Sequence, residues 1–176
     1  MIWLPDGCSR PTQVELERYW EQARAALSAA RSPESGLPDH YQVRWIGLDD
    51  ATTEEVIDLI IAGDKTGTFS LPWLIQHTGQ PEPASGDCII LVDFGGHPRL
   101  LVRLTEIATV EFGNVTAADT SIDGSPVRDL AVWIPLHTQY WNNLLAPFDL
   151  SVTAPMPVLL EKFDLLYTGG NHTDGQ

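Results

Sequence analysis

The side chains best suited to chemistry lie together in residues 62–68, which read Ala-Gly-Asp-Lys-Thr-Gly-Thr. A glycine-rich turn brings backbone amides close to the ammonium of Lys65 and to the hydroxyls of Thr66 and Thr68. Such a set of donors can hold a phosphate or a carbonyl oxygen. The order differs from that of a Walker phosphate loop, in which GxxxxGK[ST] follows a strand and opens a helix. From these residues alone, the segment is either an oxygen-binding turn or a solvated turn.

Further motifs follow this turn in a defined order. They are Gly63-x-Lys65-Thr66-x-Thr68, Pro83-x-x-Gly86-Asp87 ahead of an apolar strand, Phe112, Asp123-Gly124, Trp133-x-x-x-His137 and Val158-x-x-Glu161-x-Phe163. In this order they resemble the ASCH family, and the resemblance extends from about Trp45 to Tyr167. It implies an α+β fold, a PUA-like, partly closed antiparallel β-barrel with flanking helices, and a cleft at the GxKTxT turn.

The resemblance also implies a ligand class. The ASCH family is regarded as RNA-binding, and members are described as a ribonuclease for single strands or as an amidohydrolase of acetylated cytidine. RNA or a nucleotide is therefore the expected partner, with cleavage of single-stranded RNA as one activity. Hydrolysis of an acetylated cytidine-type nucleoside is the alternative, and a non-catalytic binding module is the third reading. In the hydrolase-type members, a lysine, a threonine and a later glutamate form the active group. They correspond to Lys65, Thr68 and the position of Asp123.

These three residue types suit amide hydrolysis. A threonine hydroxyl is a poor nucleophile until a base takes its proton, and a neutral lysine can be that base. A carboxylate can hold the lysine or pass the proton to the leaving amine. Two departures weaken the case for catalysis. Asp123 replaces the usual glutamate and is one methylene shorter, and Ile134 replaces the arginine common in long members. Asp123 is either a working carboxylate or a turn residue, since Asp-Gly is a common turn dipeptide.

Aromatic residues and a histidine are the remaining candidates for ligand contact. Trp73 follows Pro72 in an expected loop near Lys65, where its ring could stack on a base. His137 lies one helical turn after Trp133, on the same face, and could shuttle protons, contact RNA or be a structural histidine. Core packing is the alternative for each aromatic ring. The predicted ligand-binding residues are thus Gly63, Thr66, Trp73, Trp133 and His137.

The net charge restricts the partners. Ten Lys and Arg stand against 24 Asp and Glu, a formal net charge of −14. A surface this acidic repels phosphate backbones, so we expect no DNA-binding patch and only local contact with RNA. Arg99 and Arg103 share a strand face and could form a small positive strip, although a solvated face is the alternative. His40, His77 and His97 do not have the spacing of metal ligands, so no metal site is predicted. The sequence identifies no cofactor, although it is compatible with a divalent ion in the site.

Composition fits a folded domain without membrane spans. Hydrophobic residues make up 43% of the chain, and no apolar run approaches the roughly 20 residues of a membrane helix. The first residues lack an export signal. Cys8 and Cys88 lie far apart without a CxxC pattern, which favours a reducing, cytoplasmic setting.

Helices and strands that position the candidate residues can be read from capping and periodicity. Thr12 and Glu15 form a capping box before a helix over 13–31, and Thr52 with Glu55 is expected to open a second helix that ends at Gly63. The remaining expected elements are a strand over 41–46, an antiparallel hairpin of 88–93 and 99–110 around Gly95-Gly96, a helix over 131–141 and a closing strand over 157–167.

The predicted domain organisation has three parts. Residues 1–40 form an N-terminal helical extension with an irregular start, 41–168 form the ASCH-type domain, and 169–176 form a disordered tail. The extension could cap an open barrel edge, cover the cleft or support a homodimer.

Overall fold

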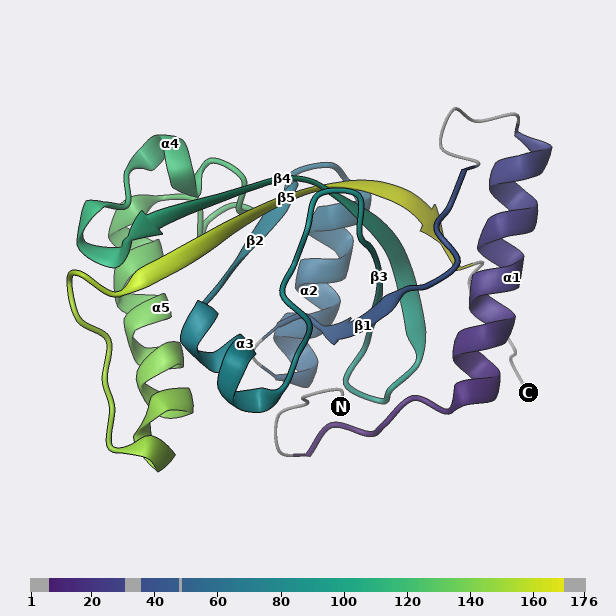
Figure 1. Cartoon of the computed structure of the whole chain (residues 1–176). Helices are drawn as coiled ribbons and strands as arrows, with labels where there is room; N and C mark the ends of the chain where they lie inside the picture. The colour runs from purple at the N-terminus through teal and green to yellow at the C-terminus, as the bar shows by residue number, and fades with distance from the viewer. Residues whose placement is uncertain (1–6, 31–35, 48, 170–176) are drawn as a thin grey trace.

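The computed structural model describes residues 7–30, 36–47 and 49–169. Helices and strands are interspersed along the chain, and the strands form one curled sheet with helices around it (Figure 1). The helices are α1 (Gln13–Ala29), α2 (Asp50–Ile61), α3 (Pro72–Thr78), α4 (Ala117–Thr120) and α5 (Leu130–Leu145), with short 3-10 turns at Phe112–Asn114 and Ala146–Phe148. The strands are β1 (Gln42–Trp45), β2 (Gly67–Ser70), β3 (Cys88–Val92), β4 (Pro98–Glu111) and β5 (Pro157–Thr168).

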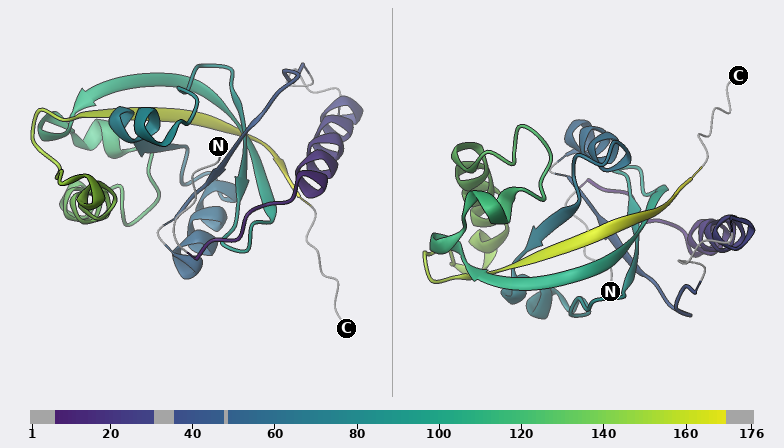
Figure 2. Two further views of the ribbon diagram at one scale, coloured as in Figure 1. Left: turned by 60° about the horizontal axis from the view of Figure 1, so that its bottom comes forward. Right: turned by 90° about the horizontal axis from the view of Figure 1, so that it is seen from above.

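The sheet is a five-stranded half-barrel with the order β1-β3-β4-β5-β2. Its two long strands, β4 and β5, curve across the whole molecule (Figure 2). Register shifts between Leu101 and Val102 and between Leu104 and Glu106 add the local bends that such curvature needs. The predicted α+β, partly closed barrel is confirmed. It is not wholly antiparallel, because β1 pairs with β3 in parallel.

Strand β3 is buried on both faces, which explains its continuous run Cys-Ile-Ile-Leu-Val. Ile89 and Leu91 belong to the core cluster that contains α2, whereas Ile90 and Val92 pack with α1. Helix α1 contributes four buried residues to that second cluster, which are Leu16, Tyr19, Trp20 and Ala23. It therefore covers the sheet at the end opposite α5 (Figures 1 and 2).

Helix boundaries follow their caps. Thr12 and Glu15 form the predicted capping box of α1. The prediction that Thr52 opens the second helix is wrong, because Asp49 is the N-cap and its carboxylate accepts from the Thr52 amide at 2.8 Å. In return, the Thr52 hydroxyl oxygen accepts a hydrogen bond from the Asp49 amide at 2.9 Å. The carboxylate of Asp49 accepts a hydrogen bond from an amide of the first helical turn that has no partner inside the helix, and Thr52 becomes the third helical residue.

Three further predicted elements are present: the hairpin, the 131–141 helix and the closing strand. The helix and the closing strand are slightly longer than predicted. Strand β2 and helix α3 were not predicted, and the expected loop around Trp73 is a helix that begins at Pro72. Most of the predicted lead-in and nearly all of the predicted tail lie outside the described residues. Gly169 is described, and its amide donates to the Arg99 carbonyl at 3.1 Å. Within the described ranges, none of the helices has the length and apolar character needed to cross a membrane.

Candidate active site

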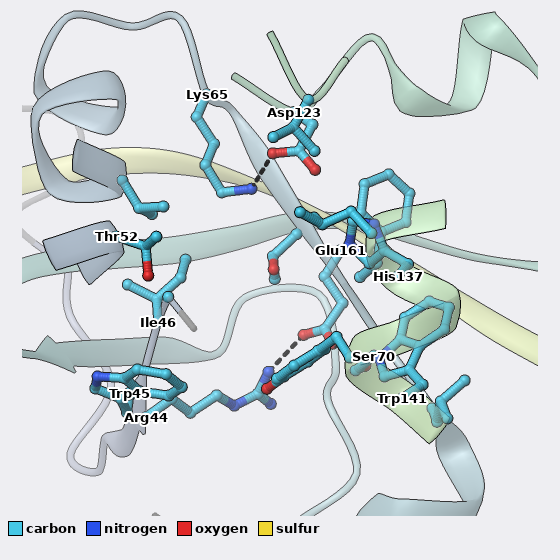
Figure 3. A pocket seen from close by; sticks show the side chains of 18 of the residues that line it. Arg44, Trp45, Ile46, Thr52, Lys65, Ser70, Asp123, His137, Trp141 and Glu161 are labelled. Atoms are coloured by element: carbon cyan, nitrogen blue, oxygen red, sulfur yellow. Dashed lines mark hydrogen bonds and ion pairs between the residues drawn. The ribbon is translucent and has the colours of Figure 1, made fainter. Parts of the chain in front are cut away.

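A pocket of about 460 Å³ opens between α2, α3, α5 and the concave side of the sheet. Aliphatic and aromatic side chains form most of its wall, and two ion pairs lie at separate places on it (Figure 3). The polar and charged side chains of this lining are Arg44, Thr52, Glu55, Lys65, Thr68, Ser70, Thr78, Gln80, Asp123, Ser125, His137, Tyr140 and Glu161. No residue of the described part of α1 belongs to the lining, so this helix does not cover the pocket.

The first ion pair joins Lys65 to Asp123. Gly63 adopts φ +73°, which ends α2 and turns the chain toward the sheet. The Lys65 ammonium then meets Asp123 Oδ1 at 2.5 Å, and each residue is only 6% exposed. The same oxygen accepts from the Gly124 amide at 2.9 Å. The shorter aspartate therefore still reaches the lysine, and the Lys65–Asp123 contact does not need the longer side chain.

Neighbouring bonds tie the two partner segments together. The Thr66 amide donates to the Ile122 carbonyl at 2.9 Å. Asp64 accepts from the Ser125 amide and pairs with the Arg128 guanidinium, and both contacts lower the pKa of that carboxyl. The Lys65 turn and the Asp123 turn are thereby fixed next to each other, although they lie far apart in sequence.

Thr68 and Ser70 come from the short strand β2. Thr68 lies opposite Glu161 in the antiparallel ladder with β5. Because side chains alternate along a strand, Thr68 and Ser70 share one face, and both line the pocket. The ladder is tight at its start, since a Cβ on Gly67 would lie 2.8 Å from the Glu161 carbonyl oxygen.

The second ion pair centres on Glu161, which is fully buried. Its Oε2 accepts from Arg44 at 2.6 Å, and its Oε1 accepts from the Ser70 hydroxyl at 2.5 Å. Arg44 also donates to Gln42, whose amide donates to Asp87 at 2.8 Å. Sequence reasoning did not select these residues as a site. The available signal for Glu161 was its place in the Val158-x-x-Glu161-x-Phe163 motif of the closing strand.

His137 lines the pocket as a neutral imidazole. Burial is the main cause that lowers its pKa from 6.5 to about 4, and Lys65 adds to this, whereas the Trp133 carbonyl and Asp123 oppose it. Nδ1 lies 3.0 Å from the Trp133 carbonyl oxygen, which can only accept. Nδ1 therefore carries the proton, and Nε2 is left as an acceptor. The ring stacks on Trp133 at 4.0 Å between centroids.

The predicted site residues separate into two groups. Lys65, Thr68, Asp123 and His137 meet in the pocket lining, whereas Gly63, Thr66, Trp73 and Trp133 lie outside it. Trp133 is completely buried among aromatic side chains of the core. Trp73 stacks on His77 at 3.6 Å in α3, away from the lining. Ile134 also lies outside the lining and is exposed.

The charges of the pocket are nearly balanced. Arg44 and Lys65 are the cationic side chains of its described lining, and each is paired with a carboxylate; Glu55 also lines the pocket. Elsewhere, Arg99 is paired with Glu54 and Asp93, so it does not present an open positive strip. Among the residues that the structure describes, no three His, Cys, Asp or Glu side chains are grouped to hold a metal ion.

The fold and the pocket define an α+β half-barrel with a site between the sheet and helices α2, α3 and α5. The sequence pattern of the ASCH domain family matches residues 44–167, and the chain belongs to this family. Helix α1 precedes that match, but it shares the core of the same sheet.

Two solved structures have a similar fold. An ASCH domain from Lactobacillus crispatus JV V101 superposes with a TM-score of 0.76 at 18% identity, covering 89% of this chain and 96% of that chain. A protein from Enterococcus faecalis V583 superposes with a TM-score of 0.75 at 19% identity, covering 94% and 99%. At these identities the likeness concerns the fold alone. A comparison with functionally curated proteins gave no match.

Proposed function

We propose that the protein binds a nucleoside, free or as one unit of an RNA, in this pocket and hydrolyses an acyl-amide bond on its base. The observation that carries the proposal is the buried Lys65–Asp123 pair at 2.5 Å, which lines the same pocket as the Thr68 hydroxyl. The ASCH family membership supports a ligand of the nucleotide class. The proposal assigns the active group to Lys65, Thr68 and Asp123, and it is supported by the presence of all three in the lining of one pocket.

Size and charge favour a small neutral ligand over a long RNA. Pockets for small molecules typically have volumes of about 300–1,000 Å³, and this one has about 460 Å³. Affinity for RNA backbones comes largely from cations that neutralise phosphates. Here both cations of the described lining are already paired, and the chain carries a net charge of −14. A neutral nucleoside avoids this repulsion.

The chemistry can be written with three residues. The Thr68 oxygen attacks the amide carbonyl carbon, and Lys65 acts as the general base that takes the Thr68 proton. The C–N bond then breaks, and the leaving amine takes a proton from the pair. Water hydrolyses the acyl-threonine ester, releases the carboxylic acid and restores the hydroxyl. Cleavage of single-stranded RNA in the same pocket is the competing activity.

One assay with two substrates tests the proposal. The wild type, Lys65→Met and Lys162→Met are incubated separately with acetylcytidine and with a mixed single-stranded RNA. Lys162 is the matched control, because it is an exposed lysine on β5 that pairs with Glu106 outside the pocket. We expect release of cytidine by the wild type and Lys162→Met but not by Lys65→Met. If RNA is cleaved in a Lys65-dependent way and no cytidine is released, the proposed amide hydrolysis is wrong and the protein is a ribonuclease.

A further inference from the structure

The pocket contains a second polar cluster that the proposed reaction does not use. It consists of Ser70, Arg44 and Glu161, and its ion pair lies apart from the Lys65–Asp123 pair on the pocket wall (Figure 3). All three residues line the pocket.

This cluster is held rigidly. Both oxygens of the buried Glu161 carboxylate are occupied, one by Arg44 and one by Ser70. The guanidinium is also fixed by Gln42, which Asp87 holds in turn. Groups that are locked by such bonds need little further ordering when a ligand binds. The Arg44 side chain nevertheless remains 17% exposed and belongs to the pocket lining.

The bonds also determine what the cluster can offer a ligand. Ser70 uses its hydroxyl proton to donate to Glu161, so its oxygen is left as an acceptor. Arg44 has five N–H donors and no acceptor, and the bonds to Glu161 and Gln42 use only part of them. An acceptor and a donor therefore stand side by side. Their complement is a ligand edge that carries an N–H next to a ring nitrogen or carbonyl oxygen.

The distance to the reactive group suits one planar ring. Thr68 and Ser70 lie two residues apart on one face of β2, which corresponds to roughly 7 Å along a strand. A single pyrimidine can reach Ser70 and Arg44 with its polar edge while a substituent on that edge extends toward Thr68.

We propose that Ser70 and Arg44 determine specificity by reading the amino-and-ring-nitrogen edge of a cytosine-type base, with Glu161 positioning both. This inference rests on the proposed function, because it assigns the ligand edge within the same pocket. Ser70 accepts from the exocyclic N–H, and Arg44 donates to the ring nitrogen or the carbonyl oxygen.

Binding of two nucleosides that differ in one group tests the assignment. Cytidine and pyrimidin-2-one riboside share the ring nitrogen and carbonyl, but the second lacks the amino group. Calorimetry should show that the wild type binds cytidine about tenfold more tightly, the effect of roughly one hydrogen bond. Ser70→Ala should lower the affinity for cytidine to that for pyrimidin-2-one riboside. Arg44→Lys should lower the affinity for both nucleosides equally. Thr78→Val is the matched control, because Thr78 lines the pocket but commits its hydroxyl proton to the Leu74 carbonyl.

The possible results separate the two proposals. If wild-type binding requires Lys65 but does not distinguish the two probes, the edge assignment is wrong and the proposed function stands. If Ser70→Ala weakens both probes to the same extent, the assignment is also wrong. If the wild type binds neither nucleoside, both proposals are overturned. Because the comparison of probes on the wild type decides the matter, a Ser70→Ala protein that fails to fold does not prevent the test.

Discussion

Lys65 and Asp123 are separated by 58 residues in sequence, and their charged groups meet at 2.5 Å in the wall of the pocket. Each is nearly buried, so their pairing has consequences for stability as well as for chemistry. Removing one member of a buried pair leaves an uncompensated charge, whereas replacing both by apolar residues is often neutral or stabilising.

A double-mutant cycle should therefore be strongly non-additive. We expect Lys65→Met or Asp123→Leu alone to lower the free energy of unfolding by about 3–5 kcal/mol, and the double variant to recover most of this loss. All three variants should lack activity. Denaturant unfolding measures the stability part. Additive losses in the double variant would show that the two groups do not interact in solution.

The pH dependence of stability should contain a contribution from His137. Its pKa is about 4 in the folded protein against 6.5 ordinarily, so between these values the unfolded chain binds more protons. Stability therefore falls as the pH is lowered from about 6.5 to about 4, by on the order of 3 kcal/mol from this group, and this contribution levels off below. Unfolding curves for His137→Gln should have a shallower slope in this window. A slope in His137→Gln equal to that of the wild type would contradict this contribution.

The tight start of β2 should control the position of the reactive threonine. A Cβ on Gly67 would lie 2.6 Å from the Ile122 side chain and 2.8 Å from the Glu161 carbonyl oxygen. Gly67→Ala should push β2 away from β5, cost about 1–3 kcal/mol of stability and lower activity at least tenfold. Gly36→Ala is the matched variant, because nothing lies within 4 Å of its added Cβ. Equal activity of the two variants would contradict the proposed role of the ladder.

Helix α1 should be essential for stability but not for ligand binding. Trp20 is 5% exposed and packs against Tyr41, whereas Val14 on the same helix is 73% exposed. Trp20→Ala should cost about 3–5 kcal/mol, and Val14→Ala should cost little. Ligand affinity, measured well below the melting temperature, should stay unchanged in both. A gain of affinity in Trp20→Ala would instead indicate that α1 restricts access to the pocket.

Local sequence signals predicted most of the fold. The Thr12–Glu15 capping box, the apolar run before Gly95-Gly96 and the alternation in the closing strand are short-range patterns, and their elements are present. Strand β2 has only four residues, too few for a clear alternation, and Pro72 after it indicates a loop as readily as the first turn of a helix.

The site was predictable only in part. Their motifs predicted Lys65, Thr68 and Asp123 as the active group, and all three line one pocket, while their catalytic role stays a prediction. The Arg44–Glu161 pair was missed because its members lie 117 residues apart, and a single carboxylate in a strand usually faces solvent. Trp133 carried a strong motif, yet its ring is entirely buried, because sequence spacing does not distinguish the inner from the outer side of a helix.

The central claim concerns the Thr68 hydroxyl as the nucleophile. The most direct measurement is the initial rate of cytidine release from acetylcytidine by the wild type, Thr68→Val and Thr66→Val. Thr66 is the matched control, since it lies in the same turn but outside the pocket lining. The account predicts a loss of at least about a hundredfold in Thr68→Val and a nearly unchanged rate in Thr66→Val. A Thr68→Val protein that releases cytidine at the wild-type rate would contradict it.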